Sequence, residues 1–514
     1  MWIPEVKKGG DICMDLQDTM YHNWIQVAWQ WIMCQTSVKR LKRPLFSHHA
    51  DGIFGPFIVR QSLQRDPNSH LYDYDLDEHI LTLSPWSHKI SAYSLDFQRN
   101  IEVSSILING EGSYFVSDPQ SRTRSQLPKT RFSVKWGSRY RFRIINSASL
   151  DCPVQLQVES HNITIIASDG APVKSTATSH LLLFPGERYD IIISADQAKS
   201  SYWIMVRGHH QCENLHQEAM LVYDGAAVLH KFTEATKSSL SVSKPYSALS
   251  AAMKKTCPNV TDVTCRPQEI KELHSRKPAE LQASEVDMKL FIPFDVYAYD
   301  GLNDTDVNFH FMLDEPPYYP SYLYNTKIPM QLPQVDRLTF KYPPSPLLSQ
   351  PESVPQGMLC NSHCRHLKFC ECLHVIHTPL NITLDVVLVD EGHGSNHSNI
   401  FHLHGYNFLV LGSESLGRPV DVAELKLNDS LDLLSRNLKD APRKDTVVVP
   451  NKGYTIIRLF TDNPGYWLFE ARSASSVIGA GMQFIIQVGE QIHLPPVPQE
   501  FPRCGLHKGP SYIF

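Results

Sequence analysis

Short runs in which apolar and polar residues alternate recur along this chain. In the clearest run, Tyr140, Phe142 and Ile144 alternate with three arginines, which places apolar side chains on one face of a strand and charges on the other. Many short strands between turns predict an all-β fold of sandwiches or barrels. Residues 422–436 are the clearest helical stretch, and we expect one short helix there, lying on a sandwich. Further strands are predicted at residues 104–108, 154–158, 189–193, 202–206, 381–389, 446–449, 454–460 and 483–488.

The length of 514 residues exceeds what one compact core usually serves, so we expect about two to three domains. Residues 227–285 are rich in Ser, Lys and Thr and weakly patterned, and residues 341–357 are rich in Pro, so both are expected to be connections. The predicted division is an unmatched N-terminal segment at 1–45, a partial first domain at 46–95, a second domain at 96–226, a linker at 227–285, a third domain at 286–492 and a tail at 493–514.

Composition excludes some classes of partner. Hydrophobic residues make up 42% and charged residues 20% of the chain, and a formal net charge of -5 without long like-charge runs offers no basic surface for nucleic acid. No stretch approaches the roughly 18 uninterrupted apolar residues of a membrane helix, so no transmembrane segment is expected. The start, MWIPEVKKGGDICMD, lacks the basic and apolar regions of a signal peptide.

Two features nevertheless favour secretion. The chain has eleven cysteines, a number more typical of a disulfide-forming compartment than of cytosol. Six Asn-x-Ser/Thr sequons, the acceptor sites of N-glycosylation, lie at Asn162, Asn259, Asn303, Asn381, Asn396 and Asn428.

A cysteine cluster leaves two interpretations open. Cys360, Cys364, Cys370 and Cys372 lie close to two histidines, His363 and His366, so they form either disulfides or a zinc site. Zinc sites favour paired CxxC spacing, whereas this cluster has CxxxC and CxC. We therefore favour disulfides, with no prediction of their connectivity.

A single β-strand can place several copper ligands close together. A blue copper centre needs two imidazoles and one thiolate, and alternate residues of a strand share a face, so an H-x-H string brings two imidazoles together. FHLHGYNFLVLG at 401–412 contains such a pair and resembles the H-P-F-H-L-H-G motif of laccases, while NPGYWLFEARSASSVIGAGMQFIIQVG at 463–489 resembles their final copper strand. Other strings that resemble insect-type laccases are ADGIFGPFIVRQ at 50–61, SSILINGEG at 104–112, YRFRIINSAS at 140–149, PGERYDIIISADQ at 185–197, SYWIMVRG at 201–208, KDTVVVPNKGY at 444–454 and LPPVPQEFPRCG at 494–505.

The chain is thus identified as similar to the laccase-type multicopper oxidases over most of residues 50–505. The resemblance implies tandem cupredoxin-like Greek-key β-sandwiches, three in number with the first incomplete. It also implies copper as cofactor, an extracellular location, and the oxidation of phenolic or catecholic substrates with reduction of dioxygen.

Carried over residue by residue, the resemblance predicts damaged copper sites. His402 and His404 stand where the family has ligands of its trinuclear cluster, but Asn399 stands in the place of the blue-copper histidine. We favour the interpretation that the two histidines are remnants packed at a domain interface. The alternative is a pair that binds a stray divalent ion weakly.

The final copper strand departs further from the family. Its H-C-H string becomes Glu470, Ala471 and Arg472, and the next histidine falls at Ser476, with one extra residue before Met482. Ala471 offers no thiolate, Glu470 is a conceivable oxygen ligand, and Arg472 is permanently cationic and repels copper. We therefore expect copper to be absent or substoichiometric.

The first domain matches the family least. The H-W-H-G string is absent, and only the shortened string at residues 47–52 remains, with His49 as a weak candidate ligand. Residues 1–45 resemble nothing in the family, which favours a truncated or misassembled coding sequence there. At residues 463–489 the ligand positions are substituted although the strand pattern is intact. This favours a second explanation, a degenerate paralogue of the oxidases.

The leading functional hypothesis is a catalytically inactive, secreted, glycosylated scaffold that binds an unidentified protein or small molecule and no nucleic acid. The alternative is a laccase that retains some copper. A weaker hypothesis is a metal-sequestering protein that uses His402, His404, Glu470 and His49. We find no G-x-S-x-G elbow, Walker loop or H-E-x-x-H helix, so hydrolase classes are disfavoured.

Overall fold

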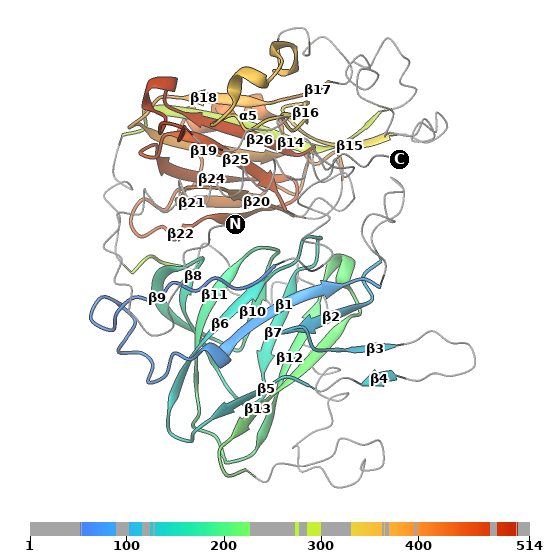
Figure 1. The fold of residues 1–514 in the computed structure, drawn as a ribbon, viewed down its shortest axis with the longest axis vertical. Coiled ribbons are helices and arrows are strands. Elements are labelled where there is room, and N and C mark those ends of the chain that lie inside the picture. Colours follow the sequence, from blue (N-terminus) through green and yellow to red (C-terminus); the bar gives the residue numbers. More distant parts are fainter. Residues whose placement is uncertain are drawn as a thin grey trace, which may run out of the picture.

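The structure is a computed structural model in which the chain forms two β-sandwiches, one above the other in Figure 1. The all-β fold predicted from the alternation is therefore confirmed. The structure describes residues 52, 54–88, 102–115, 124–126, 129–226, 273–276, 285–299, 330–361, 364, 370–394, 398–472, 481–499 and 501.

Two sheets form the first sandwich, one with strand order β2-β1-β6-β11-β8-β9 and one with order β10-β7-β12-β13-β5. Their inward faces share one apolar core that includes Phe132, Phe142, Ile191 and Leu221. The strands are β1 Ile80–Trp86, β2 Ser105–Ile108, β5 Arg131–Val134, β6 Arg139–Asn146, β7 Val154–Val158, β8 Ile163–Ser168, β9 Ala171–Thr178, β10 His180–Leu183, β11 Arg188–Ser194, β12 Ser201–Gly208 and β13 His216–Tyr223.

The second sandwich repeats this plan with orders β15-β14-β19-β24-β21-β22 and β18-β26-β25-β20-β23. Its core includes Phe294, Phe401, Trp467 and Phe484. The strands are β14 Met288–Tyr299, β15 Met330–Val335, β18 Val375–Thr378, β19 Thr383–Asp390, β20 Asn399–Leu403, β21 Phe408–Ser415, β22 Arg443–Lys444, β23 Thr446–Val449, β24 Gly453–Phe460, β25 Gly465–Ala471 and β26 Gln483–Val488.

Smaller elements decorate the two sandwiches. Two short sheets pair β3 with β4 and β16 with β17. Their bounds are β3 Ser113–Phe115, β4 Arg124–Gln126, β16 Thr339–Phe340 and β17 Glu371–Cys372. Single 3-10 turns are η1 Asp77–His79, η3 His210–Cys212, η8 Pro351–Ser353, η9 Gln356–Met358 and η11 Gln491–His493.

One α-helix, α5 at Val422–Ser430, lies within the described residues where the sequence predicts a helix over 422–436. It begins at Asp421, whose carboxylate accepts a hydrogen bond from the Ala423 N–H at 2.8 Å, as a helix N-cap does. The helix ends earlier than predicted because Asp432 adopts a positive φ of 53°, which a right-handed helix does not contain.

The predicted strands coincide with observed strands throughout, and β7, β23 and β26 match to the residue. The face of β6 that carries the arginines differs from the prediction. The alternation predicts a charged face, yet Arg143 is buried because it pairs with Asp75, while Arg141 pairs with Asp66 and Asp190. The segment before β1 therefore covers this face through ion pairs.

β1 belongs to the same sheet as β6 and pairs in parallel with it, so a domain boundary at residue 95 falls between the paired strands β1 and β2. The three-domain division stays a prediction. Among the described residues, no helix is long and apolar enough to cross a membrane.

Candidate metal centre

Two neighbouring strands of the second sandwich bring most of the predicted site residues together. β20 pairs antiparallel with β25, in a register that sets His402 opposite Glu470 and Phe401 opposite Ala471. His404 follows β20 directly, and its N–H donates to the Leu468 carbonyl at 3.0 Å. Because residues that face each other in a sheet project to the same side, the two imidazoles and the carboxylate share one surface.

The two imidazoles lie edge to face, with ring centroids 4.7 Å apart. His402 Nδ1 is 3.0 Å from the Thr446 hydroxyl and 3.5 Å from an Asp445 carboxylate oxygen. Burial, and then the positive charge of Arg472, lower the pKa of His402 to about 3. His402 is therefore a neutral imidazole that already has polar neighbours on its Nδ1 side.

The Glu470 carboxylate contacts two side chains, the His404 imidazole and the Arg472 guanidinium. Its Oε1 lies 3.2 Å from His404 Nε2 and 3.4 Å from Arg472 Nε. Burial alone raises the pKa of a carboxyl, but the hydrogen bond with His404 and the nearby charges lower that of Glu470 to about 2. The carboxylate is thus ionised, and Arg472 lies beside it as a counter-charge.

Two other predicted positions that the structure describes, Ala471 and Asn399, offer no thiolate. The Ala471 methyl group packs in the apolar core with Phe401 and Met482, where the resemblance places a thiolate. Asn399 is buried, and its Nδ2 donates to Asp390 Oδ2 at 3.0 Å. The side chains present at Ala471 and Asn399 therefore do not fit a blue copper centre.

The first sandwich approaches this surface closely. Arg188 of β11 forms a two-pronged ion pair with Asp445, with nitrogen–oxygen distances of 2.6 and 2.5 Å. Arg472 lies so near Gly186 that a β-carbon added there would come within 2.8 Å of Arg472 Nη1. The predicted packing of His402 at an interface between domains thus has a physical basis in Asp445, which touches both His402 and Arg188.

Arg188, Asp445 and Thr446 were missed as site residues by sequence reasoning. The string KDTVVVPNKGY contains Asp445 and Thr446 but marks them only as similar to the family. The sequence contains one signal. The charged residues Lys444 and Asp445 directly precede the apolar strand β23, and charged side chains next to a buried strand are uncommon unless they are paired.

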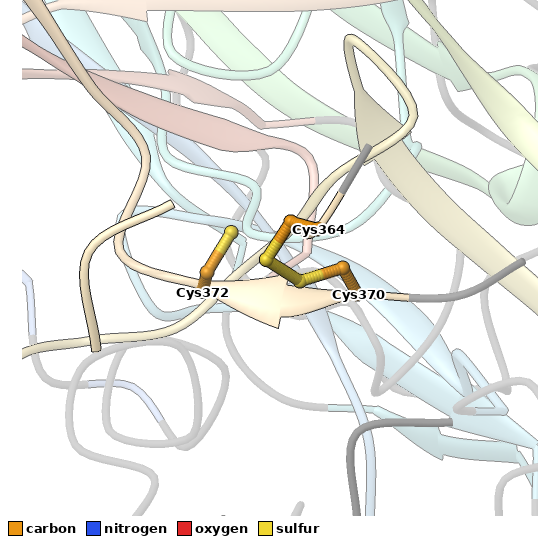
Figure 2. Close-up of side chains that lie close together, drawn as sticks. All are labelled: Cys364, Cys370 and Cys372. Carbon is orange, nitrogen blue, oxygen red and sulfur yellow. A yellow bond between two sulfur atoms is a disulfide. The ribbon is translucent and has the colours of Figure 1, made fainter. Parts of the chain in front are cut away.

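A different group has the ligand spacing of a metal site. Among residues with described positions, Cys364, Cys370 and Cys372 are the one group of three His, Cys, Asp or Glu whose ligand atoms all lie within 4.8 Å of one another. Figure 2 shows these side chains converging beside β17. They occur as disulfides, Cys364–Cys370 and Cys360–Cys372, so disulfide formation, favoured from the sequence, is confirmed and in this form no zinc thiolate exists.

A third disulfide joins Cys152 to Cys212 in the first sandwich. Three of the sequon asparagines can be placed. Asn162 and Asn381 are exposed, whereas Asn428 is half-buried within α5. Other predicted site residues lie outside the described residues, namely His49, Ser476, Asn259, Asn303 and Asn396.

Comparison with known families and proteins agrees with this architecture. Two multicopper oxidase family models match the chain, one at residues 77–226 and one at 333–490, which together cover more than half of it. Laccase-5 of Trametes villosa is 28% identical over 82% of this chain and 65% of its own length. Laccase-22 of Oryza sativa subsp. japonica is 27% identical over 75% of this chain and 64% of its own length. The chain thus spans less than two thirds of each of these laccases.

L-ascorbate oxidase of Brassica rapa subsp. pekinensis is also similar, at 25% identity over 89% of this chain and 76% of its own length. Among solved structures, Fet3p, a multicopper oxidase that functions in iron import, superposes with a TM-score of 0.59 at 15% identity, covering 88% of this chain and 73% of Fet3p. A laccase from Botrytis aclada superposes with a TM-score of 0.53 at 18% identity, covering 81% of this chain and 65% of that laccase. These structural likenesses establish the fold.

Proposed function

Because this chain belongs to the multicopper oxidase family, we propose that it is a laccase-like member that acts by binding rather than by copper-dependent oxidation. Ala471 is the observation that carries the proposal. A blue copper centre needs a thiolate, and a buried methyl group in its place supplies no ligand atom. Without that centre, electrons from a phenolic donor have no entry site.

The neighbouring charges support the same proposal. Arg472 is always protonated and lies 3.4 Å from the Glu470 carboxylate, so an incoming divalent cation meets an existing positive charge. Glu470 would have to exchange Arg472 for the metal. Of the predicted ligand positions that the structure describes, His402 and His404 then remain as two imidazole ligands. Two ligands are too few to hold several copper ions.

The deciding experiment measures metal content and visible absorption on the purified full chain. We expect less than about one copper per chain and no intense copper-thiolate band, even after incubation with copper and reductant. A blue band together with several coppers per chain would overturn the proposal. The control is a laccase loaded in the same way, which shows that the loading procedure works.

The alternative is a copper-dependent oxidoreductase of the laccase class, and the His402–His404 pair is the observation that favours it. The two functions are separated by oxygen consumption with a catechol or phenol as electron donor. Catalysed oxygen uptake that a chelator abolishes supports the oxidase, and its absence supports the binding protein. Binding of zinc or copper without oxygen uptake would instead support metal sequestration by His402, His404 and Glu470.

We also infer that the protein is secreted and glycosylated, since three disulfides and two exposed sequon asparagines, Asn162 and Asn381, are consistent with an oxidising compartment. The partner of such a scaffold is a protein or small molecule rather than nucleic acid, because the net charge is negative. Peptide mapping of protein secreted by eukaryotic cells tests this inference, and unmodified Asn162 and Asn381 would contradict it.

A further inference from the structure

Two disulfides lie side by side at the edge of the second sandwich. Cys360 is bonded to Cys372 and Cys364 to Cys370, and the sulfur atoms of Cys364, Cys370 and Cys372 lie within 4.8 Å of one another. Figure 2 shows Cys364 and Cys370 joined by their disulfide, with the Cys372 side chain beside them. Three sulfur atoms therefore lie within the span of one coordination sphere, and the fourth, that of Cys360, is bonded to one of them.

We propose that Cys360, Cys364, Cys370 and Cys372 form a redox-gated metal site that binds one Zn²⁺ ion through four thiolates when both disulfides are reduced. The proposal shares no residue with the His402–Glu470 cluster. Its outcome is therefore independent of whether the chain holds copper.

The spacing of the Cys364, Cys370 and Cys372 sulfurs suits a tetrahedral ion. Zinc–sulfur bonds of about 2.3 Å place the sulfurs of a tetrahedral site roughly 3.8 Å apart. The sulfurs of Cys364, Cys370 and Cys372, which lie within 4.8 Å of one another, need to move by about 1 Å or less to reach that separation. The Cys360 sulfur is bonded to that of Cys372 and reaches the ion by rotation of its side chain after reduction. The paired Cα atoms are 5.0 and 5.4 Å apart, so side-chain rotation after reduction can open each sulfur pair without separating the backbones.

The four cysteines are held in place by more than their disulfides. β16 and β17 pair in parallel, and backbone hydrogen bonds fix every one of the four positions. They join the Cys370 carbonyl to the Thr339 N–H at 2.9 Å, the Cys372 carbonyl to the Lys341 N–H at 2.9 Å, the Cys360 N–H to the Leu373 carbonyl at 3.2 Å and the Cys364 N–H to the Asn361 carbonyl at 3.2 Å. Reduction thus removes two covalent links but leaves this backbone framework.

The surroundings favour a closed, structural site. Cys364, Cys370 and Cys372 are buried, Cys360 is partly buried, and the cluster packs against Leu338. Four protein ligands and no open position are typical of structural zinc and not of catalytic zinc. We therefore expect the bound ion to stabilise this edge of the sandwich rather than to activate water.

The two forms are related by a balanced exchange. Each disulfide is reduced by two molecules of a thiol, which are oxidised to one external disulfide, and the cysteine sulfurs each gain a proton. Zinc binding then displaces the four thiol protons and leaves a complex with a charge of -2. Oxidation reverses the sequence by forming both disulfides and releasing the ion. An oxidising compartment therefore selects the disulfide form, and a reducing one selects the zinc form.

The test uses the full chain reduced anaerobically with a phosphine, freed of metal by a chelator and titrated with Zn²⁺. X-ray absorption at the zinc edge should show four sulfur neighbours at about 2.3 Å. The oxidised chain should not acquire this sulfur shell. A zinc shell made of nitrogen or oxygen atoms in the reduced chain would overturn the proposal, because it would place the ion elsewhere.

Matched variants locate the site. Replacing all four cysteines of the cluster by serine should weaken zinc binding at least about a hundredfold, whereas the Cys152→Ser/Cys212→Ser variant should bind as the parent does. Equal binding by the fourfold variant would contradict the proposal. If that variant does not fold, the zinc coordination shell of the single variant Cys364→Ser tests the site instead. It should give three sulfurs and one lighter neighbour, and an unchanged four-sulfur shell would refute the site.

Discussion

Arg472 and Glu470 decide the chemistry of the surface formed by β20 and β25. Glu470 lies near the end of β25 and Arg472 directly follows the strand, and their side chains meet beside His404. An ion pair of this kind neutralises the carboxylate that would otherwise attract a cation. The positive charge of Arg472 opposes the binding of a metal ion by the two imidazoles.

Arg472→His should therefore restore metal affinity. The substitution removes the positive charge, frees Glu470 and adds a third imidazole, so we expect Zn²⁺ to bind at least about tenfold more tightly, which corresponds to about 1.4 kcal/mol. Isothermal titration calorimetry on the oxidised protein measures the change. Arg443→His is the matched control, because Arg443 is exposed on β22, and its zinc affinity should equal that of the parent. Equal affinities for all three proteins would show that charge is not what excludes the metal.

At the level of elements, the ends of β14 and β19 enclose two carboxylates. Asp295 accepts hydrogen bonds from the backbone N–H groups of Val296, His393 and Gly394, at 2.6, 2.5 and 2.9 Å. Asp390 is also buried at the end of β19. Burial, and then the negative charge of Asp295, raise the pKa of Asp390 to about 7. The folded protein thus favours a protonated Asp390 in mildly acidic solution.

The sign of the resulting pH dependence follows from this raised pKa. A carboxyl whose folded pKa lies above its unfolded value of about 4 contributes stability that is fully present at low pH and is lost as the pH rises to about 7. Asp390→Asn mimics the protonated form. We expect the free energy of unfolding of the parent to fall by up to about 1.4 kcal/mol per pH unit relative to that variant between pH 4 and 7.

Urea unfolding at a series of pH values measures this difference. Asp462→Asn, at an exposed position, is the control for removal of a carboxylate as such. Parallel pH profiles for the parent and Asp390→Asn would show that Asp390 does not take up a proton in this range.

At the scale of the whole molecule, ion pairs rather than apolar side chains connect the two sandwiches at Lys444. This side chain is completely buried, and its ammonium lies 3.0 Å from Asp169, 3.1 Å from Glu187 and 2.6 Å from the Ser168 hydroxyl. Burial favours the neutral amine, but the two carboxylates raise the pKa of Lys444, which keeps it charged. The strand β22 is thereby tied to β8 and to the start of β11.

Lys444→Met should destabilise the protein strongly, because it removes the cation that pairs with buried Glu187 and leaves buried Asp169 with Arg188 alone. Removing one partner of a buried ion pair costs about 3–5 kcal/mol, so we expect a loss of that size in the free energy of unfolding. Lys439→Met, at an exposed position, should change it by less than about 0.5 kcal/mol. Differential scanning calorimetry checks both variants. A Lys444→Met protein as stable as the control would mean that the interface does not depend on this ion pair.

Local patterns in the sequence were sufficient to predict strand positions and the all-β class, because the alternation that buries one face of a strand is visible within a few residues. The residue types at 470–472 likewise showed, without any structure, that no thiolate stands there. The helix boundary was predicted less well, since its end depends on the backbone conformation of Asp432. The first-domain and glycosylation predictions remain predictions.

Only the tertiary structure decided which of these residues meet. The register that sets His402 against Glu470, the pairing of the four cysteines and the burial of Lys444 all depend on contacts between distant segments. Arg188 and Asp445 are 257 residues apart in sequence yet form one ion pair. A charged residue looks the same in sequence whether it is solvated or buried against an opposite charge. The sequence therefore determined the strands and the residue types at 470–472, and the fold determined the charge partners.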